Sequence, residues 1–515
     1  MTRRHRISGL SRSPRRRGEN SFTVIPERCI ICIVLPIAIC AISGAISCCR
    51  RDSGHRTPME SEDSLGWIRL LEAQQGPKSC AFVTDVTSTS EGKIAVCGYE
   101  MAALKGSVTL SDGTGEGTDS ARSFVCVLNG EGEALWSKRI GGLDPSRTLS
   151  ADIPMTVGAD SYGSLYVTGC FDRRVNFNPA GVGYSDGPAT AGTLSSFLLK
   201  LDKNGDFQWV VTISAADTAS HPPRILADVN AQGDVYLLGS ASDLTLRSSL
   251  GWQAQIAGNQ RTLFKLDRQG HELWKVTWAN GEARFTSMNC TNGGPIYITG
   301  SLNGDFDFDP GDHDVIPSCN GQNNGFLMRI SSDASFDWVK TWGRGSAGGQ
   351  SLAVSAQGTV YVVGWIGRSS ALNRAMNPPQ EPFPCDVHLQ CYRADGSLLW
   401  ERSWGEYALL DRPAISYADG NVFLYGWYKG RLDTGPENQS RLFNLKGYEK
   451  SFYLWGFDEK GNTILSRTWE PVPGVSQATG MDIDDAGNIF LTGGGVWKSF
   501  VIKLESSELP NGKNQ

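Results

Sequence analysis

The chain has 515 residues, of which 40% are hydrophobic and 20% charged, with a formal net charge of −6. This composition excludes a chain that is disordered throughout, and the negative charge argues against a general nucleic-acid-binding protein. The 60 Gly and 15 Trp, beside only 8 Met, favour short strands and turns over helix bundles.

The first 49 residues are typical of an export or anchoring segment. Residues 1–28 carry eight Arg and two Glu, a basic flank that we expect on the cytoplasmic side. Residues 29–49 contain no charged side chain, and about 20 apolar residues suffice to span a bilayer. The segment is therefore predicted to be a cleaved signal peptide or an uncleaved membrane anchor, and either places the remainder outside the cytoplasm.

The end of this segment adds a third alternative. Ala45-Ile46-Ser47-Cys48 resembles a lipobox, in which Cys48 would be acylated after cleavage, although Leu is commoner than Ala at its first position. Ala45 and Ser47 would also suit ordinary signal peptidase. We expect a cell-envelope protein attached to the membrane through residues 29–49 or through a lipid on Cys48. Residues 50–64 would be a polar tether.

Residues 65–506 contain a sevenfold internal repeat, which is the main architectural signal. Each copy has a Gly, an apolar or aromatic alternation and a closing Gly, and the closing glycines are 61 to 71 residues apart. The copies are GKIAVCG (Gly92–Gly98), GSLYVTG (Gly163–Gly169), GDVYLLG (Gly233–Gly239), GPIYITG (Gly294–Gly300), GTVYVVG (Gly358–Gly364), GNVFLYG (Gly420–Gly426) and GNIFLTG (Gly487–Gly493).

A second phrase follows each of the first six copies. Its clearest example is FLLKLDKNGDFQWVVTI at Phe197–Ile213, which predicts a strand, a polar turn and a second strand. Trp209 and Ile213 are four residues apart, and this spacing recurs in the other copies. In a strand such pairs lie on one face, so we expect them to pack against the neighbouring sheet.

The ends of the repeat region predict how the sheets are arranged. The Gly-bounded segment of each copy is called the Gly phrase below. After the seventh Gly phrase only one further strand is apparent, at Ser499–Leu504, so this copy lacks its Trp-containing strand. A strand of that kind is found at the other end of the repeat region, at Gly66–Leu71. We therefore predict an all-β fold, a seven-bladed β-propeller of four-stranded blades. The N-terminal strand would complete the last blade and close the ring. Residues 507–515 would be a polar tail.

The Gly-x-x-Tyr-Val-Thr-Gly phrase, followed by Phe-Leu-x-Lys-Leu-Asp-x-x-Gly-x-x-x-Trp, resembles the bacterial seven-bladed propeller-repeat (SBBP-type) family. The resemblance covers nearly all of residues 65–506. It implies the propeller fold and supplies no catalytic residues, because that family is mostly uncharacterised.

The strands of a blade are labelled A to D outward from the axis. A–B and C–D connections are tight, whereas several B–C connections are long, such as 170–196 and 301–325. All B–C and D–A connections should emerge on one face, the loop face. Together with the mouth of the axis it is the expected surface for a protein or glycan partner.

One B–C connection is acidic and is a candidate cation site. Asp305, Asp307, Asp309 and Asp312 supply oxygen ligands that suit Ca²⁺, the one cofactor considered. The spacing departs from an EF-hand, because Pro310 replaces the required Gly. The alternative is structural: alternating apolar residues before a Pro suit a strand that ends in a turn.

These features favour a non-catalytic envelope binding or scaffold protein. The alternative is an envelope enzyme, either a hydrolase or lyase that uses loop carboxylates or a quinoprotein-like dehydrogenase. Asp-x-x-Gly-x-x-x-Trp resembles the tryptophan-docking motif of quinoprotein propellers. Those proteins also use adjacent Cys residues, but Cys48–Cys49 lies outside the repeats. No catalytic residue is assigned.

Eight cysteines lie beyond the apolar segment, in an exported region that permits disulfides. Proximity in sequence favours the pairs Cys385–Cys391 and Cys290–Cys319. The alternative is that these cysteines are small buried side chains within strands.

Overall fold

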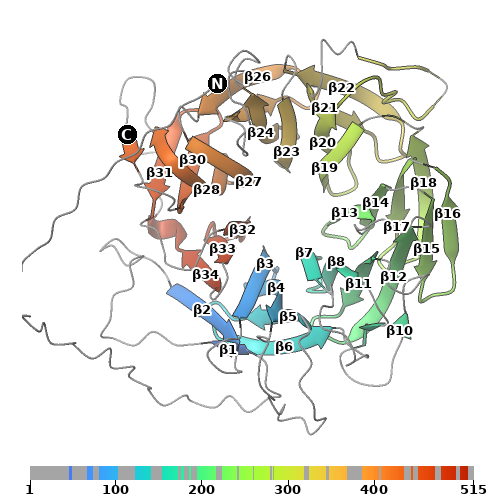
Figure 1. Ribbon diagram of the computed structural model, residues 1–515, viewed down its shortest axis with the longest axis horizontal. Helices are drawn as coiled ribbons and strands as arrows, with labels where there is room; N and C mark the ends of the chain where they lie inside the picture. The colour runs from blue at the N-terminus through green and yellow to red at the C-terminus, as the bar shows by residue number, and fades with distance from the viewer. Residues whose placement is uncertain are drawn as a thin grey trace, which may run out of the picture. The chain divides into compact units, whose positions relative to one another are not determined.

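The computed structural model describes residues 46–48, 67–73, 80–101, 122–140, 153–171, 175–178, 185–186, 194–215, 223–240, 243–258, 260–278, 281, 283–311, 313–317, 324–343, 347–367, 385–404, 408–433, 442–444, 450–469, 477–494 and 499–508. They belong to one compact unit, Ile42–Gln515. Seven antiparallel sheets, each of four or more strands, form a ring of blades, as predicted (Figure 1).

Each blade contains four principal strands, A to D from the axis outward. In that order, blades 1 to 3 consist of β3 (Cys80–Ser88), β4 (Ile94–Met101), β5 (Arg122–Leu128) and β6 (Ala134–Ile140); β7 (Ile153–Ala159), β8 (Leu165–Phe171), β11 (Ser195–Leu201) and β12 (Phe207–Ala215); and β13 (Arg224–Val229), β14 (Val235–Ser240), β17 (Arg261–Leu266) and β18 (Glu272–Trp278). Blades 4 and 5 consist of β19 (Ala283–Cys290), β20 (Ile296–Leu302), β21 (Asn324–Ile330) and β22 (Phe336–Trp342); and β23 (Ala347–Val354), β24 (Val360–Gly367), β25 (Cys385–Tyr392) and β26 (Leu398–Trp404).

Blades 6 and 7 complete the ring. They consist of β27 (Ala408–Ala418), β28 (Asn421–Asp433), β30 (Ser451–Asp458) and β31 (Thr463–Thr468); and β32 (Gln477–Ile483), β33 (Ile489–Gly494), β34 (Ser499–Leu504) and β2 (Trp67–Ala73). In blade 7, β2 pairs with β34 in antiparallel register, with Trp67 opposite Lys503. Each A strand contacts the A strand of the next blade, and β32 contacts β3.

Short elements extend some blades. The hairpin β15 (Leu244–Ser248) and β16 (Gln253–Ile256) comes from the B–C connection of blade 3, but it pairs with β12 of blade 2. The other short elements are β1 (Ile46–Cys48), which pairs with β2, the pair β9 (Val175–Asn176) and β10 (Ser185–Asp186), β29 (Leu442–Asn444), which pairs with β28, and the 3₁₀ helix η1 (Ser506–Glu508).

The polar turn between strands C and D has a physical explanation in its Asp and Gly. In blade 2 the Asp202 carboxylate accepts hydrogen bonds from the backbone amides of Asn204 and Asp206, each at 2.9 Å. Gly205 has a φ of +80°, a conformation that costs an L-residue roughly 1–2 kcal/mol. The Asp-x-x-Gly spacing is therefore the signature of this turn.

The Trp of strand D joins each blade to the next one. The Trp136 indole N–H donates to the Lys203 carbonyl at 3.2 Å, and its ring covers Gly205 so closely that a Cβ there would lie 2.9 Å away. The same hydrogen bond runs from blade 7 to 1, 2 to 3, 4 to 5 and 5 to 6. The pairs are Trp67–Gly130 (2.8 Å), Trp209–Arg268 (3.3 Å), Trp338–Ala394 (3.1 Å) and Trp400–Glu459 (2.8 Å).

Other repeat residues reinforce this contact. The Tyr166 ring of the Gly phrase packs against Trp209 of the same blade, with centroids 6.1 Å apart. The Tyr166 hydroxyl reaches the Gly233 carbonyl of blade 3, and the Lys200 ammonium donates to the Arg268 carbonyl at 2.7 Å. The repeated Tyr, Lys and Trp thus bind the adjacent blade, and the prediction that the Trp residues pack against a neighbouring sheet is confirmed.

Two blades depart from the pattern. Blade 4 has Ala334 where the other C–D turns have Gly, with a φ of +71°. Among the described residues, Trp274 of blade 3 makes no hydrogen bond to that turn, in contrast to the indoles at the other five boundaries. Blade 6 has Leu465 at the Trp position. Its neighbour, blade 7, has no tight C–D turn to receive an indole, because its paired strands β34 and β2 are more than 400 residues apart in the sequence.

The departure in blade 4 generates a prediction. Ala334→Gly should raise the free energy of unfolding by about 1 kcal/mol, because the left-handed conformation then carries no Cβ penalty. Gly205→Ala should lower it by at least that amount, because the new Cβ also displaces Trp136. Urea unfolding followed by Trp fluorescence checks both variants. Destabilisation by Ala334→Gly comparable with that of Gly205→Ala would contradict the explanation.

Candidate binding surface and inner carboxylates

The loop face is described in part. Most residues of the B–C and D–A connections lie outside the described residues, so its full outline stays a prediction. Besides the hairpin β15–β16 of blade 3, the exception is the acidic B–C connection of blade 4, residues 303–317, described without Asp312. This segment is called the acidic loop below.

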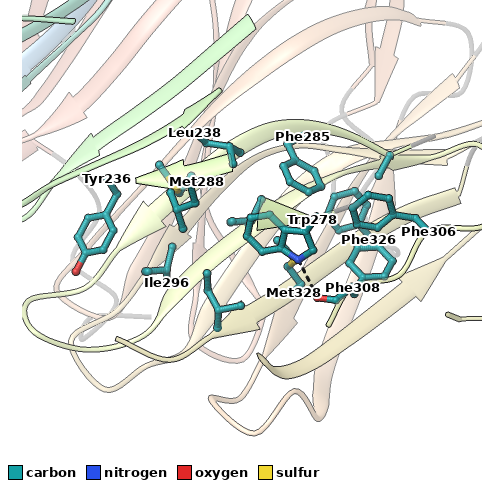
Figure 2. Packing of buried hydrophobic residues seen from close by; sticks show 14 of the residues in the cluster. Tyr236, Leu238, Trp278, Phe285, Met288, Ile296, Phe306, Phe308, Phe326 and Met328 are labelled. Atoms are coloured by element: carbon teal, nitrogen blue, oxygen red, sulfur yellow. Dashed lines mark hydrogen bonds between the residues drawn. The ribbon is translucent and has the colours of Figure 1, made fainter. Parts of the chain in front are cut away.

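The acidic loop is anchored by two buried aromatic side chains. Phe306 and Phe308 are 2% and 0% exposed, and their rings pack edge to face at 4.9 Å (Figure 2). Phe308 also contacts Phe326 of strand C, and the Trp278 indole of blade 3 donates to its carbonyl at 2.9 Å. The loop therefore sits on the interface between blades 3 and 4.

The carboxylates between these rings hold the loop backbone. The Asp307 carboxylate accepts hydrogen bonds from the Asp309 amide at 3.1 Å and from the Val315 amide at 2.8 Å. In blade 2, at the same place in the repeat, the Asn176 side-chain oxygen accepts from the Asn178 amide at 3.0 Å. An uncharged side chain performs the same task there, which favours the structural interpretation of Asp307.

The cation site stays a prediction as a set of four residues, because Asp312 lies outside the described residues. Within those residues, no three His, Cys, Asp or Glu side chains are placed to hold a metal ion. Asp307 and Asp309 instead accept bonds from backbone amides, with the Gly311 amide donating to Asp309 at 2.8 Å.

The acidic loop nevertheless presents a mixed surface to solvent. Asp305, His313 and Asp314 are exposed, and Ile316 is 50% exposed. This anchored loop therefore exposes two carboxylates and one apolar side chain.

The Asp307 contacts generate a prediction that separates the structural role from the metal role. Asp307→Asn should leave the thermal midpoint nearly unchanged, because the amide oxygen still accepts both hydrogen bonds. Asp307→Ala should lower stability by about 1–3 kcal/mol, because two backbone amides lose their acceptor. Thermal unfolding with and without Ca²⁺ checks this. A rise with Ca²⁺ in the parent chain that is lost in Asp307→Asn would instead establish a cation site.

A second group of carboxylates joins the innermost strands. Asp85 accepts a hydrogen bond from the Val157 amide of blade 2 at 3.0 Å, and Asp228 accepts one from the Cys290 amide of blade 4 at 2.6 Å. Asp482 of blade 7 accepts from the Ser88 amide of blade 1 at 2.6 Å. A strands are sheet edges whose free amides need acceptors, and these three carboxylates supply them across blade boundaries.

The environment of Asp85 changes its titration. Burial raises the pKa of Asp85 to about 7, and the nearby Asp482 carboxylate adds to the rise. Hydrogen bonds from the backbone amides of Val157 and Val86 act in the opposite direction and lower it. Burial likewise raises the pKa of Asp228 and of Asp482. None of the three was predicted from the sequence. The signal that could have found them is an acidic residue within an otherwise apolar A strand.

The raised pKa predicts how stability depends on pH. In the unfolded chain Asp85 ionises near its usual pKa of about 3.9, whereas in the folded chain it holds its proton to about pH 7. Its contribution to stability is therefore fully present below about pH 4 and is lost as the pH rises through 7.

Asp85→Asn should remove this dependence while keeping an acceptor for the Val157 amide. We expect the variant to unfold at a higher temperature than the parent at pH 8 and at a similar temperature at pH 4. Asp206→Asn, at an exposed turn, is the control and should leave the pH profile unchanged. A parallel downward shift of Asp85→Asn at both pH values would show that the carboxylate is ionised throughout.

The proposed disulfides need correction. Cys290 and Cys391 are free thiols and both are buried, with Cys391 at 0% exposure. Cys385 and Cys391 lie on the same extended strand, β25, six residues apart, so their Cα atoms are about 20 Å apart. Cys319 lies outside the described residues. Cys97 is also a buried free thiol, and the side chains of Cys126 and Cys170 are buried, which favours a role for these residues as small core side chains.

The N-terminal predictions fall mainly outside the described residues, as do residues 29–45 and Cys49. The backbone of Cys48 lies in β1, opposite Leu71 of β2. In the part of the chain that the structure describes, no helix has the length and apolar character needed to cross a membrane. The anchor, the signal peptide and the lipid on Cys48 stay predictions.

Comparison with known proteins adds only likeness of fold. No family model matches the chain, so the resemblance to SBBP-type repeats stays a prediction, and no curated protein matches. The similar solved structures include the WD40 β-propeller domain of Doa1 (11% identity, TM-score 0.34, covering 87% of this chain and 99% of that one). Others are the polysaccharide lyase Uly1 (9%, 0.40, 82% and 89%) and a Synechocystis apocarotenoid oxygenase mutant (10%, 0.39, 85% and 92%). At these scores they carry no argument about function.

Proposed function

We propose that the protein is a cell-envelope binding or scaffold protein whose loop face receives a protein or glycan partner. The observation that carries the proposal is the acidic loop. Phe306 and Phe308 fix it to the blades, while Asp305, Asp314 and Ile316 remain exposed. A surface that is ordered before binding loses little conformational entropy when a partner arrives.

The chemistry of the acidic loop narrows the partner. Carboxylates favour a partner with Lys, Arg or amino-sugar groups, and they steer its approach by long-range attraction. Ile316 supplies an apolar contact next to them. The partner in this proposal is therefore a basic protein surface or an amine-bearing glycan.

The inner carboxylates have a structural task in this proposal. Asp85, Asp228 and Asp482 each accept a backbone amide of the adjacent blade, so they serve the ring itself. The location in the envelope rests on the basic and apolar segments of residues 1–49.

The proposal is tested by affinity capture of envelope proteins and glycans on the immobilised full chain. The test variant combines Asp305→Ala, Asp314→Ala and Ile316→Ser. A matched control combines Glu131→Ala, Asp206→Ala and Leu135→Ser, which changes two acidic residues and one exposed apolar residue near the tight turns.

We expect one stoichiometric partner, held at least tenfold more weakly by the test variant and equally well by the control. Salt should weaken the parent interaction, because charge attraction contributes to it. Equal retention by both variants, or capture of nothing, would overturn the assignment of binding to the acidic loop.

A further inference from the structure

Because the repeat occurs seven times, each residue can be compared with the equivalent residues of the other blades. Strand C of blade 5 differs from the other C strands in this comparison. The residue opposite the closing Gly of the Gly phrase is aromatic in five blades. The seven residues, in blade order, are Phe124, Phe197, Thr262, Phe326, His388, Tyr453 and Phe500. Two positions later the residues are Cys126, Leu199, Phe264, Met328, Gln390, Trp455 and Ile502.

Blade 5 therefore places two polar side chains where the other blades have mostly apolar ones. His388 and Gln390 are 6% and 3% exposed. Burial of polar groups opposes folding unless they are hydrogen-bonded. Only blade 3 shares a polar residue at the first position, where the hydroxyl of buried Thr262 lies 2.9 Å from that of Thr277, and no other blade has a polar residue at both positions. A local departure of this kind is expected where a site has a task other than packing.

The two residues belong to one chain of contacts across strands β25 and β26. His388 lies directly opposite Ser403, and Gln390 lies opposite Glu401, so all four share one face of the hairpin. The His388 Nδ1 is 2.8 Å from the Ser403 hydroxyl oxygen, and its Nε2 is 3.5 Å from the Glu401 carboxylate. The Gln390 amide donates to the same carboxylate oxygen at 3.2 Å.

The contacts assign a role to each nitrogen of the ring. The Glu401 carboxylate, 3.5 Å from Nε2, favours a proton on that nitrogen, and the Nδ1 lone pair then accepts the Ser403 hydroxyl proton. Burial lowers the pKa of His388, against the opposing charges of Glu401 and Asp386, so the ring is neutral at pH 7. A neutral imidazole next to a hydroxyl and oriented by a third group is the arrangement that activates a serine.

The arrangement is also accessible from one side. Ser403 is exposed and is the next-to-last residue of β26, at the end that leads to the loop face. Glu401 is half-exposed, whereas His388 lies beneath. The Gln390 Oε1 is buried, and it has no hydrogen-bond partner within the described residues.

We propose that Ser403 is a nucleophile for acyl transfer from carboxylic esters, with His388 as its general base and Glu401 as the positioning residue. Ser403 Oγ attacks the ester carbonyl carbon as its proton passes to His388 Nδ1. The bond to the alkoxy oxygen then breaks, and His388 returns the proton to release the alcohol. Water, deprotonated by His388, attacks the acyl-serine and releases the carboxylic acid. This inference is independent of partner binding by the acidic loop.

The test is covalent labelling of the full chain by a fluorophosphonate probe, with peptide mass mapping, beside hydrolysis of p-nitrophenyl acetate. Labelling should fall on Ser403 and disappear in Ser403→Ala. His388→Phe introduces the residue that four of the other six blades have at this position, so it should fold with an unchanged or higher thermal midpoint. It should nevertheless react at least 100-fold more slowly, the scale of general-base assistance. Hydrolysis by the parent should rise with pH as His388 loses its proton, with an inflection below 6.5.

A matched control comes from blade 4, where Thr341 lies opposite Phe326 at the equivalent place. Thr341→Ser adds a serine without the neighbouring imidazole and should gain no labelling at that position. The proposal is overturned if the parent is unlabelled at Ser403. It is also overturned if folded His388→Phe is labelled as fast as the parent.

Discussion

The structure depends on one contact: the indole of a D-strand Trp lying on the glycine of the next blade's C–D turn. A four-stranded blade is too small to bury its own faces, so each must be covered by a neighbour. The indole does this with a large apolar surface and directs its N–H to a carbonyl of the turn, as Trp338 does with Ala394. Because the acceptor belongs to the adjacent blade, this contact fixes both the distance between the two blades and their relative orientation.

The same contact explains residues that otherwise look unrelated. Gly396 is required both for its φ of +81° and because a Cβ there would lie 2.9 Å from the Trp338 ring. Leu465 is acceptable in blade 6 because blade 7 offers no tight turn to an indole. The Asp-x-x-Gly-x-x-x-Trp phrase is therefore one half of a structural joint, and the quinoprotein resemblance that it suggested has this packing explanation.

Much of the fold could be predicted from the sequence, because the repeat states the same pattern seven times. The alternation in Gly163–Gly169 marks a buried strand, and the spacing of Trp209 and Ile213 marks a face. The sequence predicted less well which segments pair when they belong to different blades. The hairpin of residues 244–256 belongs to blade 3 in sequence but pairs with blade 2 in space. Cys290 and Cys319 were paired from proximity alone, but Cys290 is a buried free thiol.

The candidate sites likewise combine local features that the sequence predicts with long-range contacts that it does not. The alternation around Phe306 and Phe308 was visible in the sequence, and both side chains are buried. That Asp307 caps the loop backbone follows from a turn geometry that sequence does not specify. Likewise, Asp85 acts on the next blade, and His388 and Ser403 meet through strand register. Comparison of each blade with its neighbours was the signal available for His388, since an aromatic residue is the rule at that position.

The most direct test of the account is a double-mutant cycle at the interface between blades 4 and 5, with Trp338→Leu and Gly396→Ala measured singly and together by urea unfolding. If the indole lies on the glycine, Gly396→Ala should cost less in the Trp338→Leu background, because only the backbone penalty remains. We expect a coupling energy of about 1 kcal/mol or more, in the range of residues in contact. An equal loss of unfolding free energy for Gly396→Ala in both backgrounds would show that the Trp338 indole does not lie on Gly396.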